Sequence, residues 1–374
     1  MSAIEKEKIM AALSAVIDPA MGKVGDVTID GGTVYASIEV DPAKGAALEP
    51  LRQAAQKALE ALPGVETAQA VLTAERKAPP ALAVKGGARP QQGGGVSHKI
   101  SSRPVAPQVR HIIAVASGKG GVGKSTVAAN LAAAFAIMGK RTGLLDADIY
   151  GASQPTMTGL NLRPETNSAD MIVPPLCDIA GHALKVMSMG FFVERGAPVI
   201  WRGPMVHSAI QQLFRDVEWG ALDVLVVDLP PGTGDAQLSL AQYVPLAGAV
   251  IVSTPQDVAL SEAEKGLRMF EKTKVPVFGI VENMSYHTCE NCGHRDEIFG
   301  HGGARAAAAR LNVPFLGEIP LLPAIRRQAD SGVPFVAFDA AQRSAPGVVH
   351  PAAESFMNIA ARIWMALPDK KAAV

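Results

Sequence analysis

The decapeptide SGKGGVGKST, residues 117–126, constrains the fold of this chain more than any other segment. It fits the pattern G-x-x-x-x-G-K-[ST] on Gly118, Gly123, Lys124 and Ser125. The apolar run HIIAVA precedes it, and the helical segment TVAANLAAAFAIMG follows it. A strand, a glycine-rich loop and a helix in this order place backbone N–H groups and a helix N-terminus around an anion. The segment therefore predicts a nucleotide phosphate site inside an α/β fold.

Six short apolar runs predict the sheet of that fold. They are HIIAVAS, TGLLDAD, LDVLVVDLP, GAVIVST, PVFGIVENM and VPFLGEIP. Their almost continuous apolar character is typical of strands buried on both faces of a parallel sheet. Helical segments alternate with them, so we expect a doubly wound, mainly parallel sheet. Ligands bind such sheets at the carboxyl ends of the strands.

The chain divides into three parts by composition. Residues 1–77 contain two amphipathic helical segments and three strand-like segments, two of them joined by a DGG turn, and predict a small α/β domain. Residues 78–108 are rich in Pro, Gly, Gln and Ala, which is typical of a flexible linker. Residues 109–374 would form the nucleotide-binding domain.

Composition excludes several classes of protein. Lys plus Arg and Asp plus Glu both number 35, so no global field attracts nucleic acid or an anionic membrane. The N-terminus lacks the pattern of a signal peptide, and the most apolar run, Val127–Met138, is too short to span a bilayer. Three cysteines do not make a disulfide framework. We therefore expect a soluble, cytoplasmic protein that binds neither nucleic acid nor a membrane.

Carboxylates at two strand ends complete the predicted phosphate site. LLDAD ends at Asp146 and Asp148, and VLVVDLPPGTGD carries Asp228 before a Gly- and Pro-rich turn. Lys124 would neutralise the β- and γ-phosphate oxygens, while Ser125 would bind Mg²⁺. Asp228 has the position of the acid that holds Mg²⁺ through water. Taken singly, each carboxylate segment is also compatible with a solvated strand end.

Four motifs together resemble the deviant-Walker P-loop ATPases: KGGVGKS, LLDADIYG, DLPPGTGD and VENM. More narrowly, residues from about 105 to about 345 resemble the Mrp/ApbC group of iron–sulfur cluster carrier ATPases. The resemblance implies a homodimer that uses ATP and Mg²⁺. It assigns a role to the second lysine of the loop, Lys119, which in this class contacts the nucleotide phosphates across, or next to, a two-fold dimer interface.

The resemblance also implies roles for the remaining site residues. Asp148 would position or activate the attacking water, with Lys119, Lys124 and Asp228 as the other catalytic residues. Asp146 would support the Mg²⁺ side together with Ser125 and Asp228. The expected nucleotide-binding residues are Gly118, Lys119, Gly120, Gly121, Val122, Gly123, Lys124, Ser125, Thr126 and, as the residue that reads adenine, Asn283.

The segment YHTCENCGH contains Cys289 and Cys292 in a C-x-x-C motif. One motif supplies two thiolates, whereas a [4Fe–4S] cluster usually takes four. A two-fold dimer supplies the other two, because the same patch meets itself at the axis. We therefore expect a [4Fe–4S] cluster at a homodimer interface, as the resemblance also implies. Cys177 stands alone and is expected to be a small apolar filler.

Three other interpretations of the cysteines stay open. A structural zinc ion could use the same four thiolates of a dimer. A single chain could bind zinc through Cys289, Cys292, His287 and His294. The two cysteines could also form a redox-active dithiol, although they do not open a helix after a strand as in thioredoxin-like proteins.

The outer segments suggest accessory roles. LSAVIDPAMGKVGDVTID resembles the domain often fused ahead of Mrp ATPases and found alone in iron–sulfur assembly proteins. The cysteine usual in that family should fall near VDPAKGAALEP and is missing there, so docking or regulation is expected of this domain. The C-terminal helix AAESFMNIAARIWMAL has a single basic residue, Arg362, and is expected to pack on the sheet instead of binding a membrane.

These observations predict an ATP-hydrolysing carrier that delivers a [4Fe–4S] cluster to apo iron–sulfur proteins and works with cluster-assembly scaffolds. The alternative is a ParA/MinD-like partitioning or positioning ATPase that acts as a nucleotide-switched binding module. The C-x-x-C motif and the balanced charge favour the carrier.

Overall fold

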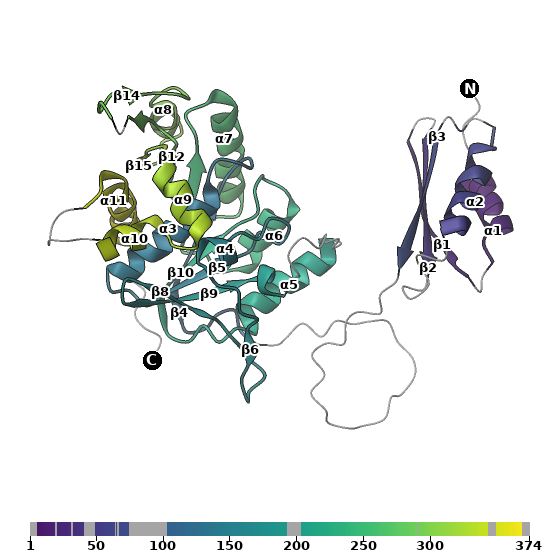
Figure 1. The fold of residues 1–374 in the computed structure, drawn as a ribbon, viewed down its shortest axis with the longest axis horizontal. Helices are drawn as coiled ribbons and strands as arrows, with labels where there is room; N and C mark the ends of the chain where they lie inside the picture. Colours follow the sequence, from purple (N-terminus) through teal and green to yellow (C-terminus); the bar gives the residue numbers. More distant parts are fainter. Residues whose placement is uncertain are drawn as a thin grey trace. The chain divides into compact units, whose positions relative to one another are not determined.

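The structure is a computed structural model, and Figure 1 shows the chain as a ribbon. It describes residues 6–18, 21–30, 33–40, 49–63, 65, 67–74, 103–192, 203–289, 291–342 and 349–368. The chain divides into two compact units, Met1–Val96 and Ser97–Val374. Most of the predicted linker, residues 78–102, lies outside the described residues, so its boundaries stay predictions.

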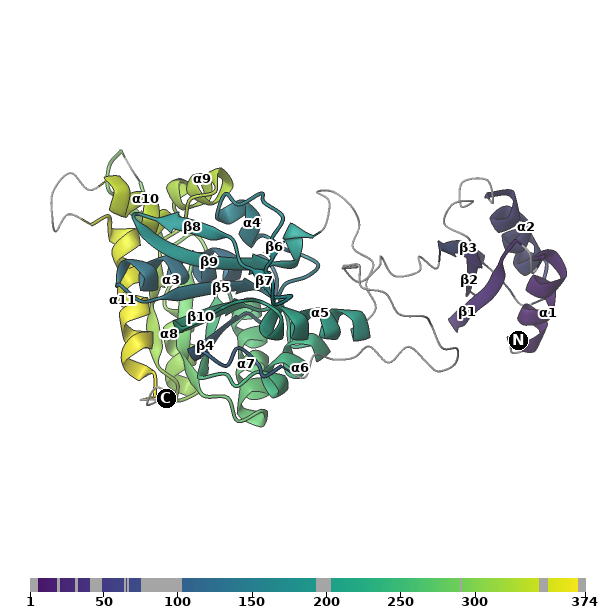
Figure 2. The same cartoon turned by 90° about the horizontal axis from the view of Figure 1, so that it is seen from below.

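The N-terminal unit is a small α/β sandwich of one sheet and two helices. Its strands are β1 (Lys23–Asp30), β2 (Thr33–Val40) and β3 (Thr67–Ala74), in the order β1-β2-β3. The helices α1 (Lys6–Val16) and α2 (Glu49–Glu60) cover one face of this sheet (Figures 1 and 2). β1 and β2 form the expected antiparallel hairpin, whereas β3 pairs with β2 in parallel after α2. The core of the unit includes Ile9, Leu13, Val34, Ile38 and Leu59.

The second unit contains an eight-stranded sheet with the strand order β15-β12-β11-β4-β10-β5-β9-β8. The six predicted strands are present as β4 (Val109–Ala116), β5 (Thr142–Asp146), β10 (Leu222–Asp228), β11 (Gly248–Ser253), β12 (Val277–Asn283) and β15 (Phe315–Ile319). Every pair among them is parallel. Strands β4 and β5 lie on either side of β10 and are parallel to it. The three motifs that follow these strands therefore lie together at their carboxyl ends.

Two strands of this sheet were not predicted from the sequence. They are β8 (Leu176–Ile179) and β9 (His182–Ser188), a hairpin that adds to β5 at one edge. β9 is parallel to β5, and β8 is antiparallel to β9. The sheet is therefore mainly, but not wholly, parallel. Two short pairs stand outside it: β6 (Glu165–Thr166) with β7 (Ile172–Val173), and β13 (His287–Thr288) with β14 (Arg295–Asp296).

Helices cover both faces of the large sheet, as expected of a doubly wound fold. α3 (Lys124–Ile137), α10 (Phe335–Gln342) and α11 (Pro351–Ala366) pack on one face. The other face is covered by α5 (Gly203–Arg215), α6 (Asp235–Tyr243), α7 (Asp257–Lys272) and α8 (Gly303–Arg310). The shorter helices are α4 (Gln154–Met157), α9 (Pro323–Ser331) and the 3₁₀ turn η2 (Met189–Phe191). Strand β4 shows why two cores form: Ile113 and Val115 point to the first face, Ile112 and Ala114 to the second.

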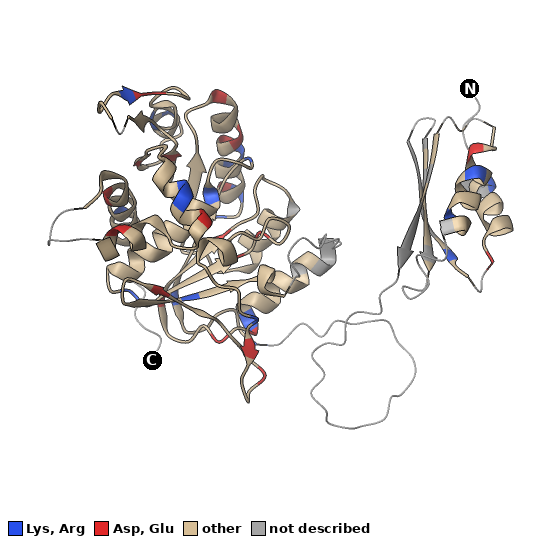
Figure 3. Cartoon of the chain, in the orientation of Figure 1, with Lys and Arg blue, Asp and Glu red and all other residues tan. Residues whose placement is uncertain are grey.

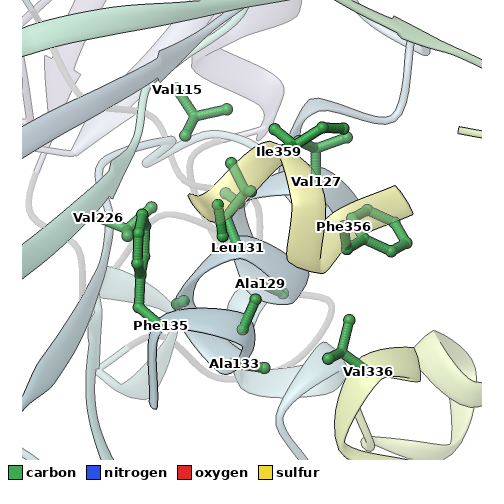
Figure 4. Packing of buried hydrophobic residues seen from close by; sticks show 14 of the residues in the cluster. Val115, Val127, Ala129, Leu131, Ala133, Phe135, Val226, Val336, Phe356 and Ile359 are labelled. Carbon is green, nitrogen blue, oxygen red and sulfur yellow. The ribbon is translucent and has the colours of Figure 1, made fainter. Parts of the chain in front are cut away.

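Helix α11 is part of the core. Its residues Phe356, Ile359 and Ile363 are at most 1% exposed, and Figure 4 shows the first two in the cluster that also contains Leu131 and Val127 of α3. The prediction that this helix packs on the sheet is therefore confirmed. In the described part of the chain, no helix has the length and apolar character needed to cross a bilayer. Acidic and basic residues are mixed on outer helices such as α7 (Figure 3).

Candidate nucleotide site and cysteine hairpin

The phosphate loop runs from the end of β4 to the start of α3 and depends on its glycines. Gly123 has φ +81°, in the left-handed region that glycine adopts without strain, and it precedes the first residue of α3. Gly118 lies against the backbone of Glu262 in α7, where any Cβ would collide. A side chain at either position would displace the loop. The lack of space explains why the motif has glycine at both positions.

Lys124 lies at the centre of the site. It is 6% exposed, and its ammonium group forms an ion pair with Asp228 Oδ1 at the end of β10. Asp148 Oδ2 is 3.8 Å from the same nitrogen, and Ser125 Oγ is 3.3 Å from it. Asp228 itself is completely buried. The structure thus brings together the lysine, the serine and two of the three carboxylates that the sequence singled out.

The third carboxylate, Asp146, faces the protein. Its Oδ2 accepts hydrogen bonds from Ser153 N, Gln154 N and Ser188 Oγ at 3.0–3.1 Å, and its Oδ1 accepts one from Asp148 N at 3.1 Å. Burial, and then the negative charge of Asp228, raise the pKa of Asp146 to about 7 despite these donors. Asp146 therefore fixes the loop after β5, and its support of Mg²⁺ stays a prediction.

Asp148 lies between Gly151 and Lys124. Its Oδ1 accepts a hydrogen bond of 3.1 Å from Gly151 N, while Oδ2 faces Lys124. Burial raises its pKa, and the charge of Lys124 acts in the opposite direction. The side chain is 11% exposed and lines the cavity described next.

A cavity of about 220 Å³ lies over the phosphate loop. It is lined by eight of the predicted residues: Lys119, Gly120, Gly121, Gly123, Lys124, Ser125, Thr126 and Asp148. Ser117, Ser153, Met157 and Pro231 also line it and were not predicted. Ser153 and Met157 lie in the segment YGASQPTM, one residue after the LLDAD motif. Their closeness to that motif is the sequence signal that could have identified them. The predicted residues that do not line it are Gly118, Val122, Asp146, Asp228 and Asn283.

Lys119, the additional lysine of the loop, lines this cavity. Its side chain is half-buried and makes no hydrogen bond or ion pair with any described residue. Its backbone carbonyl accepts a hydrogen bond of 2.9 Å from Ser117 Oγ, which fixes the loop at this point. Its contact with phosphate at a dimer interface stays a prediction.

Asn283 ends β12 beneath the phosphate loop. Its Nδ2 donates a hydrogen bond of 2.8 Å to Val122 O, and the residue is 6% exposed. This contact gives the side chain a structural role in holding the loop. Its role in reading adenine stays a prediction.

The C-x-x-C motif forms the turn between β13 and β14. Cys289 N donates to His294 O, and Gly293 N donates to Cys289 O, both at 2.9 Å. Cys289 is half-buried and Cys292 is exposed, so the turn presents its cysteines at the surface. We call residues 287–296 the cysteine hairpin; residue 290 lies outside the described residues.

Arg295 anchors the cysteine hairpin to the rest of the second unit. Its guanidinium lies 3.8 Å from the ring centroid of Tyr286 and 3.5 Å from Glu318 Oε2. It is also 3.2 Å from Nδ1 of His301. A hairpin of two short strands is marginal by itself, so these contacts fix where the turn lies.

The described residues contain one group of three potential metal ligands within 4.8 Å of one another, Glu282, His301 and Glu318. It includes neither cysteine and neither His287 nor His294. Glu282 accepts a hydrogen bond of 2.7 Å from Ala304 N at the start of α8, and Glu318 is paired with two arginines. These acids are already satisfied by protein groups. Among the described residues, Cys289, Cys292, His287 and His294 supply no group of three ligands within 4.8 Å of one another, so the single-chain zinc site stays an untested alternative.

Cys177 lies in β8, and 7% of it is exposed. Burial, and then the charge of Asp178, raise the pKa of its thiol to about 11. It packs in the core on the α3 face, as a small apolar residue would. The prediction of a filler is confirmed.

Comparison with known proteins places this geometry in a family. Residues 108–364 match the family model described as NUBPL iron-transfer P-loop NTPase (ParA), and residues 6–70 match one described as iron–sulfur cluster assembly protein. An "iron–sulfur cluster carrier protein" of Synechocystis is 43% identical over 341 residues, 88% of this chain and 91% of that protein. The mouse "iron–sulfur cluster transfer protein NUBPL" is 51% identical over 248 residues, 66% of this chain and 76% of that protein.

A solved structure agrees with the sequence comparisons. A nucleotide-binding protein from Archaeoglobus fulgidus, in complex with ADP, is 40% identical to this chain and superposes with a TM-score of 0.55. The match covers 65% of this chain and 95% of that protein. The phosphate loop, the strand order and these relatives lead to one conclusion: the chain belongs to the NUBPL iron-transfer family of P-loop NTPases.

Proposed function

We propose that this protein is an ATP-hydrolysing iron–sulfur cluster carrier. In this proposal it holds a [4Fe–4S] cluster between two subunits and transfers it to apo-proteins. The observation that carries the proposal is the cysteine hairpin: Cys289 and Cys292 are presented at the surface by the same chain segment that supports the phosphate loop through Asn283. The names of its relatives, iron–sulfur cluster carrier and transfer proteins, support the same cargo.

The residues of the site fit Mg²⁺-ATP. Mg²⁺ prefers oxygen ligands, and Ser125 Oγ and Asp228 Oδ1 both lie next to Lys124 Nζ. When bound, Mg²⁺ would neutralise charge on the phosphates. The chain supplies the rest: loop N–H groups bind the phosphates, and Lys124 exchanges Asp228 for phosphate oxygens. Asp148, 3.8 Å from Lys124, would orient the attacking water.

Lys119 would complete the site from the loop itself. Phosphoryl transfer depends mainly on positioning and on stabilising negative charge, so a further cation near the terminal phosphate accelerates it. The half-buried Lys119 lines the cavity with no described partner, which leaves it available to phosphate at a two-fold interface. A homodimer is therefore part of the proposal.

The number of ligands that a cluster needs supports the same dimer. Two thiolates from each subunit supply the four that a [4Fe–4S] cluster takes. An exposed turn reaches its own copy across a two-fold axis without any change of fold. Because the cluster would bind the dimer and not the monomer, cluster loading would stabilise the dimer.

The N-terminal unit has no thiol to contribute. All three cysteines of the chain, at positions 177, 289 and 292, lie in the second unit. The match of residues 6–70 to an iron–sulfur cluster assembly family supports a docking role toward cluster-assembly scaffolds or recipients. Direct metal binding by this unit is not part of the proposal.

The proposal is tested by anaerobic reconstitution with iron and sulfide, followed by size-exclusion chromatography and metal analysis. We expect about four irons per dimer and none in Cys289→Ala or Cys292→Ala, since each change deletes two of the four ligands. Cys177→Ala, which alters a buried thiol, is the matched control and should load normally. One zinc per monomer, retained on dilution and lost in His287→Ala or His294→Ala, would contradict the shared cluster.

A further inference from the structure

Gln154 connects three parts of the nucleotide site. It is the first residue of α4, and none of it is exposed. Its Nε2 donates to Asp228 Oδ2 at 2.8 Å and to Ser125 O at 3.0 Å. Its backbone N donates to Asp146 Oδ2 at 3.1 Å. One side chain thus links the end of β10 with the start of α3, from a position next to the end of β5.

The orientation of the Gln154 amide follows from its neighbours. A carboxylate and a backbone carbonyl only accept hydrogen bonds, so the amide NH₂ must face both of them. The amide oxygen is then buried and has no donor among the described residues. An apolar side chain of similar length would avoid this unsatisfied acceptor. The advantage of glutamine over an apolar residue at this position is therefore the two hydrogen bonds that its amide donates.

Gln154 and Lys124 divide the carboxylate of Asp228 between them. Lys124 Nζ binds Oδ1, and Gln154 Nε2 binds Oδ2; the described residues offer this carboxylate no other donor. When Lys124 binds phosphate oxygens instead, Asp228 keeps only the amide. A buried carboxylate with one remaining donor keeps its orientation only if that donor is itself held in place. Gln154 is held by its hydrogen bonds to Ser125 O and to Asp146 Oδ2.

We propose that Gln154 is a positioning residue of the Mg²⁺ and phosphate site. It keeps Asp228 Oδ1 and Ser125 Oγ, which converge on Lys124 Nζ, directed to the same point after Lys124 has moved to the nucleotide. This role rests on the proposed binding of Mg²⁺-ATP. It acts through Asp228 and Ser125 and needs no contact between Gln154 and the nucleotide.

The test compares Gln154→Met, which keeps the length of the side chain without its hydrogen bonds, with Gln154→Glu, which puts a carboxylate against Asp228. Gln242→Met, on the exposed side of α6, is the control for the same substitution. The full-length protein is titrated with a fluorescent ATP analogue, with and without Mg²⁺, and Mn²⁺ binding is followed by electron paramagnetic resonance. Thermal unfolding checks that each variant is folded.

We expect Gln154→Met to need about 10- to 100-fold more Mg²⁺ for half-maximal nucleotide binding, the range found when outer-shell partners of metal ligands are removed. Gln154→Glu should be weaker still. Binding without Mg²⁺ should change by less than about twofold, and Gln242→Met should match the wild type. In an Asp228→Asn background, Gln154→Met should have no further effect on the Mg²⁺ requirement, because its partner is already altered.

Three results would overturn the positioning role: an unchanged Mg²⁺ requirement in Gln154→Met, an equal loss of binding with and without Mg²⁺, or full additivity with Asp228→Asn. If Gln154→Met fails to fold, the residue is structural, and a Gln154→Glu variant that folds with a normal Mg²⁺ requirement also overturns the role. A wild-type protein that binds no ATP would instead refute the proposed function itself.

Discussion

Asn283 donates a hydrogen bond of 2.8 Å to the carbonyl oxygen of Val122 and thereby joins the end of β12 to the phosphate loop. Gly123 permits this approach, because any Cβ at that position would collide with Asn283 Nδ2. Six residues after Asn283 the chain reaches Cys289. The nucleotide site and the cysteine hairpin are thus connected through one short, continuous segment.

This relationship predicts that Asn283 links nucleotide state to cargo. Asn283→Ala should load a cluster normally but lose most of the effect of ATP on the rate of cluster transfer, because the hydrogen bond to the loop is gone. Transfer to an apo-protein is followed by absorption or circular dichroism, with and without ATP. If Asn283 also reads adenine, the variant will lose its preference for ATP over GTP; a full ATP effect on transfer would refute the link.

The two lysines of the phosphate loop should differ in what they contribute. Lys124→Ala removes the main phosphate cation and should abolish ATP hydrolysis. It also leaves the buried Asp228 without its ion-pair partner, which should lower the free energy of unfolding by about 3–5 kcal/mol. Lys119→Ala should slow hydrolysis by about 100-fold or more with no loss of stability, since Lys119 has no described partner.

Steady-state hydrolysis and urea unfolding separate these two cases. Lys272→Ala, at the exposed end of α7, is the control for removal of a surface lysine. Unchanged turnover in Lys119→Ala would show that the extra lysine takes no part in the reaction.

Asp148 should affect chemistry more than binding. Asp148→Asn keeps the shape of the side chain and its acceptor oxygen for Gly151 N, but it removes the charge that would orient and activate water. Nucleotide binding should stay close to that of the wild type, while single-turnover hydrolysis falls by about 100-fold. Comparable losses in binding and in turnover would make Asp148 a binding residue.

Asp146 should make stability depend on pH. Its pKa is about 7 in the fold and about 4 in an unfolded chain, so the folded state binds the proton more tightly between these values. The free energy of unfolding therefore falls as pH rises from 4 to 7, by about 4 kcal/mol at most.

Asp146→Asn removes this titration, so its stability relative to the wild type should rise over the same pH range. Urea unfolding followed by tryptophan fluorescence measures it, because all three tryptophans lie in the second unit. A constant difference between variant and wild type from pH 4 to pH 7 would contradict the assignment.

The sequence predicts the parts of this fold that depend on local pattern. Continuous apolar runs identify six strands of the large sheet, and the glycine motif identifies the loop, because both signals are contained within a few residues. The β8–β9 hairpin escapes prediction because polar residues and Gly181 interrupt its apolar pattern, and only the exposed edge of β5 explains why it forms a sheet.

Contacts between distant segments are the part that pattern reasoning misses. Gln154 and Asp228 are 74 positions apart, and Asn283 and Val122 are 161 apart. Nothing in YGASQPTM distinguishes a buried glutamine from a solvated one before β5 and β10 are placed side by side. The sequence places the carboxylate of Asp146 on the Mg²⁺ side but does not reveal its four donors, three in the segment after β5 and one, Ser188 Oγ, at the end of β9.

The cysteine hairpin contributes neither of its cysteines to the three hydrophobic clusters of the chain that the structure describes. In a zinc finger, by contrast, the metal is bound and the domain is folded in a single event, so releasing the ion means unfolding. Here the turn is held by backbone hydrogen bonds and by Arg295, and neither depends on the thiolates. A protein that has released its cluster would keep its fold and could bind another cluster without refolding. In the proposed carrier, a recipient would then compete only with four sulfur ligands and would not have to unfold the donor.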